Sequence, residues 1–213
     1  MAFGRKNYNK KLCLYCKNGE FKKIKRLSSS VKFDYNGNEP LKLACKHGHF
    51  DIVKHLMCER KCCDTKTDYN LLFCYACESG DLRIVLYLLK IYSDYINFEY
   101  ENQLALRHVF MNSHFDIINY LREYFQIYKI KPDYYALIKS ACISDNFEMV
   151  QYLFDNFLDF DKKYRGDDTF YCACKSGNED ISKYFVEKFP KIDHKRCRDV
   201  TNDRFAADFL QKI

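Results

Sequence analysis

The sequence predicts an all-α protein in which short helical pairs stack into a solenoid. One phrase occurs six times along the 213 residues: a small or apolar pair, two variable residues, a turn position that is most often Gly, and an apolar helix. The second residue of the pair, which we call the anchor, falls at Cys16, Cys45, Cys77, Phe110, Cys142 and Cys174. Successive anchors are 29, 32, 33, 32 and 32 residues apart. A period of this length indicates an architecture of stacked repeats.

The first half of each repeat is expected to be a short helix that ends at a tight turn. An apolar residue four positions before the anchor lies on the same helix face as the anchor, at Leu12, Leu41, Phe73, Leu106, Ile138 and Phe170. Glycine follows the anchor at Gly19, Gly48, Gly80 and Gly177, where a positive φ would end the helix. Ser113 and Asp145 replace this glycine in the fourth and fifth repeats. If φ is positive at Asp145, its replacement by Gly should stabilise the protein.

The second half of each repeat carries apolar residues at helical spacing. They are Ile24 and Leu27; Ile52, Val53 and Leu56; Ile84, Val85, Leu88 and Leu89; Ile117, Ile118 and Leu121; Met149, Val150 and Leu153; and Ile181 and Phe185. Polar connectors such as residues 61–70 and 160–168 are rich in residues that form turns. A helical pair this short cannot bury both of its faces alone, so neighbouring pairs are expected to stack.

The repeated phrase and its flanks resemble the ankyrin repeat. Residues 34–56 read DYNGNEPLKLACKHGHFDIVKHL, which is similar to the family pattern D-x-x-G-x-T-P-L-H-x-A-A-x-x-G-H-x-x-V-V-x-x-L. Glu39 and Lys42 replace the Thr and His of the T-P-L-H motif, and the other repeats keep mainly its apolar third residue. The heavy use of Tyr, Phe, Asn, Lys and Ile is also similar to that of mimivirus-like ankyrin proteins from giant amoeba-infecting viruses.

The resemblance implies one continuous solenoid domain between two atypical ends. Residues 1–11 are expected to form a basic N-terminal arm, and residues 12–189 the ankyrin-repeat solenoid. Its repeats are expected at about 12–33, 34–66, 67–98, 99–131, 132–162 and 163–189. One further period after the last anchor reaches Ala206, so residues 190–213 are expected to form a degenerate C-terminal capping repeat.

The composition predicts a soluble intracellular protein. No apolar run approaches the roughly 18 residues of a membrane span, and residues 1–8 do not resemble a secretory signal. Five of the twelve cysteines are anchors, where a free Cys acts as a small apolar residue, so we expect these five to be reduced and buried. The chain is expected to be a cytoplasmic monomer, in the host cell if the protein is viral.

No sequence motif predicts an enzyme, a cofactor or a metal centre. Two Cys-x-x-Cys pairs occur, but Cys16 and Cys77 are anchors and are expected to face neighbouring repeats. Zinc sites use such spacings, and the alternative ligands outside the repeating positions are Cys58, Cys62 and Cys63. Of the clustered histidines, His49 is expected to serve the turn, His47 to lie at the surface, and His55 to point outward from its helix.

The resemblance implies that a partner protein, such as a host protein, binds the concave face formed by the connector tips and the exposed sides of the first helices. Tyr100, Met111, Tyr135 and Ile143 are the expected hot spot, because aromatic and apolar side chains dominate binding energy. The predicted partner-binding residues are Tyr35, Lys46, His47, Glu78, Tyr100, Met111, Asn112, Tyr135, Ile143, Tyr164, Arg165 and Lys175.

The charge distribution supports an alternative binding surface at the N-terminal end. The net charge is +6, yet residues 1–32 hold ten Lys or Arg and the single acid Glu20, which gives +9, so the other 181 residues carry −3. Such a basic cap could bind nucleic acid or another anionic surface through phosphate contacts. The aromatic residues Phe3, Tyr8, Tyr15 and Phe21 could then stack on bases.

Overall fold

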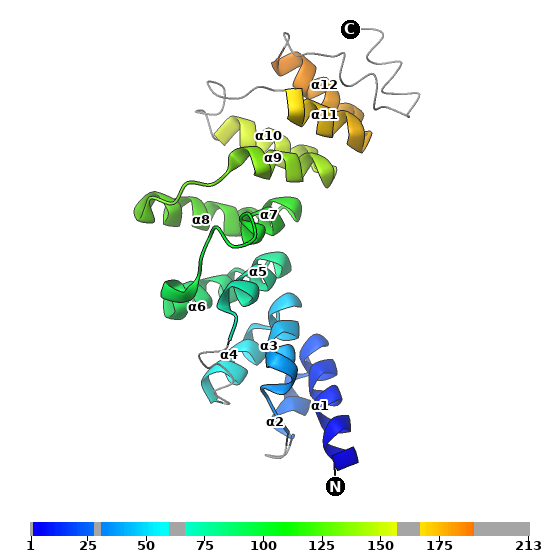
Figure 1. The fold of residues 1–213 in the computed structure, drawn as a ribbon, viewed down its shortest axis with the longest axis vertical. Coiled ribbons are helices and arrows are strands. Elements are labelled where there is room, and N and C mark those ends of the chain that lie inside the picture. Colours follow the sequence, from blue (N-terminus) through cyan, green and yellow to red (C-terminus); the bar gives the residue numbers. More distant parts are fainter. Residues whose placement is uncertain (1, 28–30, 60–66, 157–166, 190–213) are drawn as a thin grey trace. The chain divides into compact units, whose positions relative to one another are not determined.

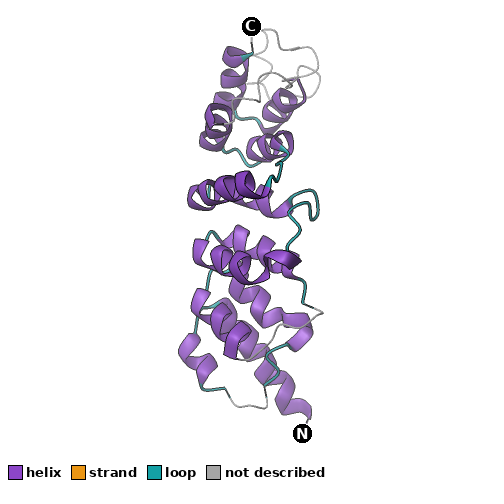
Figure 2. Cartoon of the chain, turned by 90° about the vertical axis from the view of Figure 1, so that its left-hand side faces the viewer, coloured by secondary structure: helices purple, strands orange, loops and turns teal. Residues whose placement is uncertain are grey.

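The computed structural model describes residues 2–27, 31–59, 67–156 and 167–189 (Figure 1). The chain divides into two compact units, Met1–Tyr128 and Lys129–Ile213, which we call unit 1 and unit 2. The boundary falls near the end of the predicted fourth repeat, 99–131. All regular elements in the described parts of both units are helical (Figure 2). The predicted capping repeat at 190–213 lies outside the described residues.

In its described residues, unit 1 consists of helical pairs in which a tight turn joins a first helix to a second helix. The first helices are α1 (Ala2–Lys17), α3 (Tyr35–Lys46), α5 (Tyr69–Ser79) and α7 (Leu104–Met111). The second helices are α2 (Phe21–Lys25), α4 (Phe50–Lys54), α6 (Leu82–Tyr92) and α8 (Phe115–Tyr128). A π-helical turn, η1 (His55–Glu59), continues α4, and a 3-10 turn, η2 (Ser93–Tyr95), continues α6.

Unit 2 repeats the same arrangement. Its first helices are α9 (Tyr134–Ile143) and α11 (Asp167–Ser176), and its second helices are α10 (Phe147–Asn156) and α12 (Glu179–Lys188). The helical pairs of both units confirm the all-α repeat prediction.

Like helices pack on like helices within each unit. In unit 1, α1 packs on α3, α3 on α5 and α5 on α7, while α4 packs on α6 and α6 on α8. In unit 2, α9 packs on α11 and α10 on α12. Equivalent positions in successive repeats therefore lie next to one another, and they form rows along each unit.

The core of each unit is built from the residues that the repeat pattern identified. All six anchors are at most 5% exposed, and the apolar residue four positions before each anchor is at most 1% exposed. Full burial of a leucine-sized side chain contributes about 1.5–3 kcal/mol, so each such row is a large share of the stability. The five anchor cysteines are buried, as predicted.

A left-handed residue joins the two helices of every repeat. The φ angle lies between 70° and 77° at Gly19, Gly48, Gly80 and Gly177. Ser113 and Asp145 have φ angles of 55° and 59°, so the backbone has the same left-handed conformation where glycine is missing. The fold therefore requires a left-handed backbone at this position whichever residue occupies it, and glycine is only the residue that adopts it with the least strain.

The residue after this turn often contacts the preceding repeat. The Nε2 atom of His49 lies 2.9 Å from the carbonyl oxygen of Lys17, and the Nε2 atom of His114 lies 3.1 Å from that of Glu78. In unit 2, the Asn178 side chain donates a hydrogen bond to Asp145. The prediction that His49 serves the turn is confirmed, and its bond also joins two repeats.

Acidic and amide side chains begin several of the helices. Asp68, Asp81 and Asp133 accept hydrogen bonds from the backbone N–H groups of Leu71, Arg83 and Ala136. Asn146 and Asn178 do the same at the starts of α10 and α12, where the donors are Met149 and Ile181. These caps satisfy N–H groups that have no partner inside the helix, and each contributes about 1 kcal/mol.

Three local features differ from the sequence-based expectations. Helix α1 begins at Ala2, so residues 2–11 are part of the first helix and not a separate arm. The backbone of Asn36, Gly37 and Asn38 is left-handed, and the right-handed part of α3 follows it. His55 was expected to point outward but is 4% exposed, because it lies three residues after the buried Ile52 and packs edge-on against Phe21.

The left-handed conformation of Asp145 leads to a stability prediction for unit 2. Asp145→Gly and Asp145→Ala both remove the hydrogen bond from Asn178, so they differ mainly in backbone strain. We expect Asp145→Gly to be the more stable of the two by about 1 kcal/mol, since alanine is strained at positive φ. Thermal unfolding followed by circular dichroism measures the difference. Equal melting temperatures would contradict the assigned turn.

The two glycine turns of the second and third repeats should differ in their tolerance of alanine. Both positions have positive φ, so Gly48→Ala and Gly80→Ala share a strain cost of about 1 kcal/mol. An added Cβ would lie 3.6 Å from its nearest neighbour at Gly48, but 2.6 Å from His114 Nδ1 at Gly80. We therefore expect the larger loss for Gly80→Ala in urea denaturation, and partial recovery on adding His114→Ala. Equal losses at the two glycines would refute the contact with His114.

Candidate functional site

Unit 1 presents a row of side chains at the carboxyl ends of its first helices. Lys17, Lys46, Glu78 and Met111 directly follow the anchors of α1, α3, α5 and α7, and all but the half-buried Glu78 are exposed. Because the first helices pack in succession, these positions lie side by side. We call this row the first-helix face, together with the residues beside it, which are His47, Tyr75, His108 and Asn112.

Lys46 connects the second and third repeats on this face. Its Nζ atom lies 3.0 Å from Glu78 Oε1 and 5.4 Å from the centroid of the Tyr75 ring. The two charged side chains are 43% and 27% exposed, so the ion pair adds little to stability. Its effect is to hold an ammonium group, a carboxylate and an aromatic ring in one place.

His108 brings the fourth repeat to the same cluster. Burial lowers the pKa of its imidazole; nearby Glu78 opposes this shift, while Arg107 and Lys46 add to it. The pKa of His47 is also lowered, first by burial and then by Lys17, His49 and Lys46. Both histidines are therefore favoured in the neutral form, and the positive charge of the face comes from its lysines.

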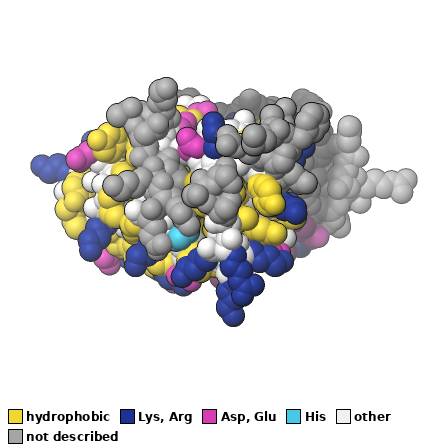
Figure 3. Space-filling view, turned by 90° about the horizontal axis from the view of Figure 1, so that it is seen from below, with side chains coloured by type: hydrophobic (Ala, Val, Ile, Leu, Met, Phe, Trp, Pro, Cys, Tyr) yellow, Lys and Arg dark blue, Asp and Glu magenta, His cyan; other side chains and the backbone are white. Residues whose placement is uncertain are grey.

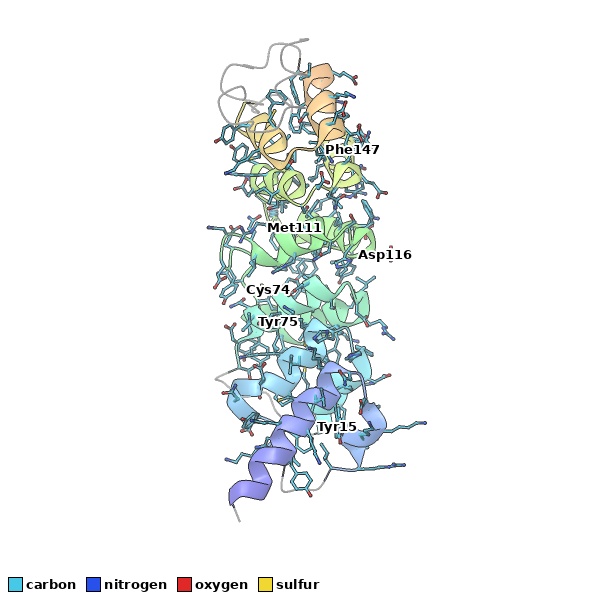
Figure 4. The ribbon with its side chains drawn as sticks, turned by 90° about the vertical axis from the view of Figure 1, so that its right-hand side faces the viewer. Tyr15, Cys74, Tyr75, Met111, Asp116 and Phe147 are labelled. Carbon is cyan, nitrogen blue, oxygen red and sulfur yellow. The ribbon has the colours of Figure 1, made fainter. Side chains whose placement is uncertain are left out.

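Met111 provides the apolar part of the first-helix face. Its side chain is 39% exposed at the end of α7. The adjacent Asn112 is exposed and donates a hydrogen bond of 2.9 Å from Nδ2 to the carbonyl oxygen of His108. Figure 4 labels Met111 together with Tyr75 of α5 and Tyr15 of α1. The face therefore contains an apolar side chain close to fixed polar groups.

Two of the predicted connector tyrosines are only partly exposed. Tyr35 and Tyr100 are both half-buried. Burial raises the pKa of Tyr100, and the nearby carboxylates of Asp68 and Glu101 raise it further. Asp68 and Glu101 also act on the neighbouring Cys74, where burial is the main cause of a pKa of about 12. Tyr100 therefore lies in an acidic, partly closed environment between the connector and α5.

Unit 2 carries its own exposed stripe. Tyr135, Lys139 and Ile143 are spaced four residues apart on α9, and all three are exposed, with Ile143 at 61%. Lys175 of α11 is also exposed. The structure thus places Tyr135 and Ile143 on one helix face, whereas Tyr100 and Met111 belong to unit 1. Tyr164 and Arg165 lie outside the described residues.

The basic N-terminal end is formed by α1, α2 and the residues after them. The described cations of this region are all exposed, namely Lys10, Lys11, Lys17, Lys22, Lys23, Lys25, Arg26 and Lys32. Glu20, the one acid of residues 1–32, forms an ion pair with Lys23. The ammonium groups of Lys11, Lys23 and Lys25 lie over the rings of Tyr8, Tyr15 and Phe21. Some of the rings that were expected to stack on bases therefore already hold a cation.

The positions of the cysteines bear on the metal sites that the sequence analysis considered. Cys74 and Cys77 are buried, and burial raises both thiol pKa values, so these thiols stay protonated at neutral pH. Cys58 is exposed and its Sγ lies 2.8 Å from the Tyr87 hydroxyl, while Cys62 and Cys63 lie outside the described residues. Across the described part of the chain, no three Cys, His, Asp or Glu side chains are grouped to hold a metal.

None of the described helices combines the length and apolarity needed to span a membrane.

Three residues of the first-helix face, Lys17, Tyr75 and His108, were not among the partner-binding residues predicted from the sequence. Tyr75 and His108 both lie two positions before their anchors, on the third and fourth repeats. Their residue types did not mark Tyr75 and His108 as members of this face. Their shared position, two residues before the anchor, is the signal that could have identified them.

The lowered pKa of His108 predicts acid-sensitive stability. Because its folded-state pKa lies below the ordinary value of 6.5, its neutral form favours folding, and this contribution is fully present above about pH 6.5. Stability is then lost as the pH falls through the lowered pKa. We expect His108→Gln to flatten the decline in urea-unfolding free energy between about pH 7 and pH 5. A decline that is the same with and without His108 would contradict this assignment.

Comparisons with known proteins agree with this geometry. A family model described as "Ankyrin repeat" matches residues 36–69, and one described as "Ankyrin repeats (many copies)" matches residues 138–186. The first match lies in unit 1 and the second in unit 2. A search of curated proteins gave no significant match. The two family matches and the paired helices support identification of the chain as an ankyrin-repeat protein with an all-α repeat fold.

Proposed function

We propose that this chain is a non-enzymatic module that binds a partner protein through the first-helix face of unit 1. Ankyrin repeats generally mediate protein–protein interactions, which supports the class of function. The observation that carries the proposal is the fixed cluster of Lys46, Glu78 and Tyr75, which lies on the same face as the exposed Met111.

The preorganisation of this cluster favours binding. Lys46 is held by a carboxylate and a ring on the neighbouring repeat, so part of its side-chain entropy is lost before a partner arrives. Met111 is flexible and polarizable, and such side chains adapt well to an apolar pocket. A partner that packs an apolar side chain against Met111 and places polar groups beside Lys46 and Glu78 would complement the first-helix face.

Unit 2 supports a second contact of the same class. The α9 stripe of Tyr135, Lys139 and Ile143 places an aromatic ring and a large apolar side chain on either side of a lysine. Tyr is enriched at interface hot spots. We propose that this stripe binds protein independently of unit 1. A single hot spot that combines Tyr100 and Met111 with Tyr135 and Ile143 stays a prediction from the sequence.

The residue usage adds a narrower proposal about the partner. Its similarity to the ankyrin proteins of giant amoeba-infecting viruses suggests an adaptor that acts in the host cytoplasm on a host protein. Amoebal lysate is therefore the first source in which to look for partners.

Site-specific photo-crosslinking tests the first-helix face. A photoreactive phenylalanine analogue at Met111 is expected to capture a distinct protein from nuclease-treated amoebal lysate. The matched control is the same analogue at the exposed Asp116, which lies on α8 of the same repeat (Figure 4). Equal capture at both positions would contradict a specific face. A protein that is captured from untreated lysate but not from nuclease-treated lysate would indicate that the contact runs through nucleic acid.

The captured protein then allows a quantitative test. We expect the double variant Lys46→Ala and Met111→Ala to weaken its affinity about tenfold or more, which corresponds to about 1.4 kcal/mol. Isothermal titration calorimetry measures the change, and Lys90→Ala on the exposed side of α6 serves as the control. An affinity that is insensitive to the double variant would exclude this face as the binding site.

A further inference from the structure

We infer that the exposed face of α1 is a separate docking site for an acidic protein segment that carries an apolar side chain. This surface consists of Lys10, Lys11, Leu14, Lys17 and Tyr15, and we call it the α1 face. It shares Lys17 with the first-helix face, but it differs from that face in its charge and in lying on the first repeat alone.

The sign of the charge is the first observation. A terminal repeat needs a polar outer surface to stay soluble, and a mixture of acids and bases would serve that purpose. Here the described cations of α1 and α2 are all exposed, and the single acid Glu20 is already paired with Lys23. Seen from the N-terminal end, Lys and Arg side chains gather at one edge with hydrophobic side chains beside them (Figure 3). A field of one sign steers an anionic partner toward the surface.

The position of Leu14 is the second observation. At 3.6 residues per turn, Leu14 falls in the middle of the exposed arc of α1, with Lys10 and Lys17 on one side and Lys11 on the other. Its side chain is 52% exposed, while Leu12 and Cys16 on the opposite arc are fully buried. An apolar centre with a charged rim is the arrangement found at protein-binding hot spots.

The aromatic rings of this region favour a protein over a nucleic acid. The ammonium groups of Lys11 and Lys23 lie 5.7 and 5.3 Å from the ring centroids of Tyr8 and Tyr15, and that of Lys25 lies 4.4 Å from the centroid of Phe21. A base could not stack on a ring face that an ammonium already covers. A phosphate backbone also offers no apolar group for Leu14. An acidic segment with an apolar side chain satisfies both the lysines and the leucine.

Two synthetic peptides test this preference on the full chain. One is a fluorescein-labelled peptide of repeated Glu-Glu-Leu, and the other has the same length and charge with Ser in place of Leu. We expect the Leu peptide to bind about fivefold more tightly in fluorescence anisotropy, because it buries part of Leu14. Leu14→Ser should remove this difference, and Lys10→Glu with Lys17→Glu should weaken both peptides.

The controls separate this site from general charge attraction and from the first-helix face. Lys54→Glu with Lys90→Glu makes the same change in net charge at exposed positions of α4 and α6, and it should leave binding of the Leu peptide unchanged. Equal affinity for the two peptides, or equal loss in the control variant, would overturn the proposal. Tighter binding of a labelled DNA duplex that is insensitive to Leu14→Ser would assign the surface to nucleic acid instead. The Met111→Ala variant should bind the Leu peptide normally, so failure of either proposal can be recognised separately.

Discussion

The fold depends on the burial of one apolar residue, small in five of the six repeats, near the end of each first helix. The anchor lies where two repeats meet, and five of the six anchors are cysteine. A side chain of this size fills the space between neighbouring first helices without forcing them apart. Burial also raises the pKa of Cys77 well above its usual value, so the thiol stays neutral in the apolar interface. The close approach of α1, α3, α5 and α7 follows from this constraint, and so does the row of equivalent side chains on their exposed side.

The tight turn is the second consequence of this close packing. A chain that must reverse direction within three residues of the anchor needs a left-handed residue, and Ser113 and Asp145 adopt that conformation without glycine. The residue after the turn then reaches the preceding repeat, as His49 does at Lys17 and His114 at Glu78. Each turn therefore contributes to the interface between repeats as well as to the helical pair that it closes.

The sequence predicted the features that recur once in every repeat. The anchors and the residues four positions before them are apolar in every repeat, and the turn position is Gly in four of the six; the structure confirms these positions as buried residues and left-handed turns. Features that depend on a single repeat were harder to predict. His55 follows Ile52 by three residues, and this helical spacing places it on the buried side despite its polar ring. The start of α1 at Ala2 was missed because its first two turns carry Arg and Lys in place of the repeat pattern.

The candidate site follows the same division between recurring and local features. Repeat position alone predicted that Lys46, Glu78 and Met111 lie on the same side of their helices, because equivalent positions share one orientation. The contacts between those side chains depend on their length and on what faces them from the next repeat, and this information is absent from any single repeat. Lys46 reaches both Glu78 and Tyr75 only because α3 and α5 pack closely. The buried anchors that stabilise the fold therefore also bring the residues of the first-helix face together, so substitutions that widen the spacing of the first helices should alter the face without touching any of its residues.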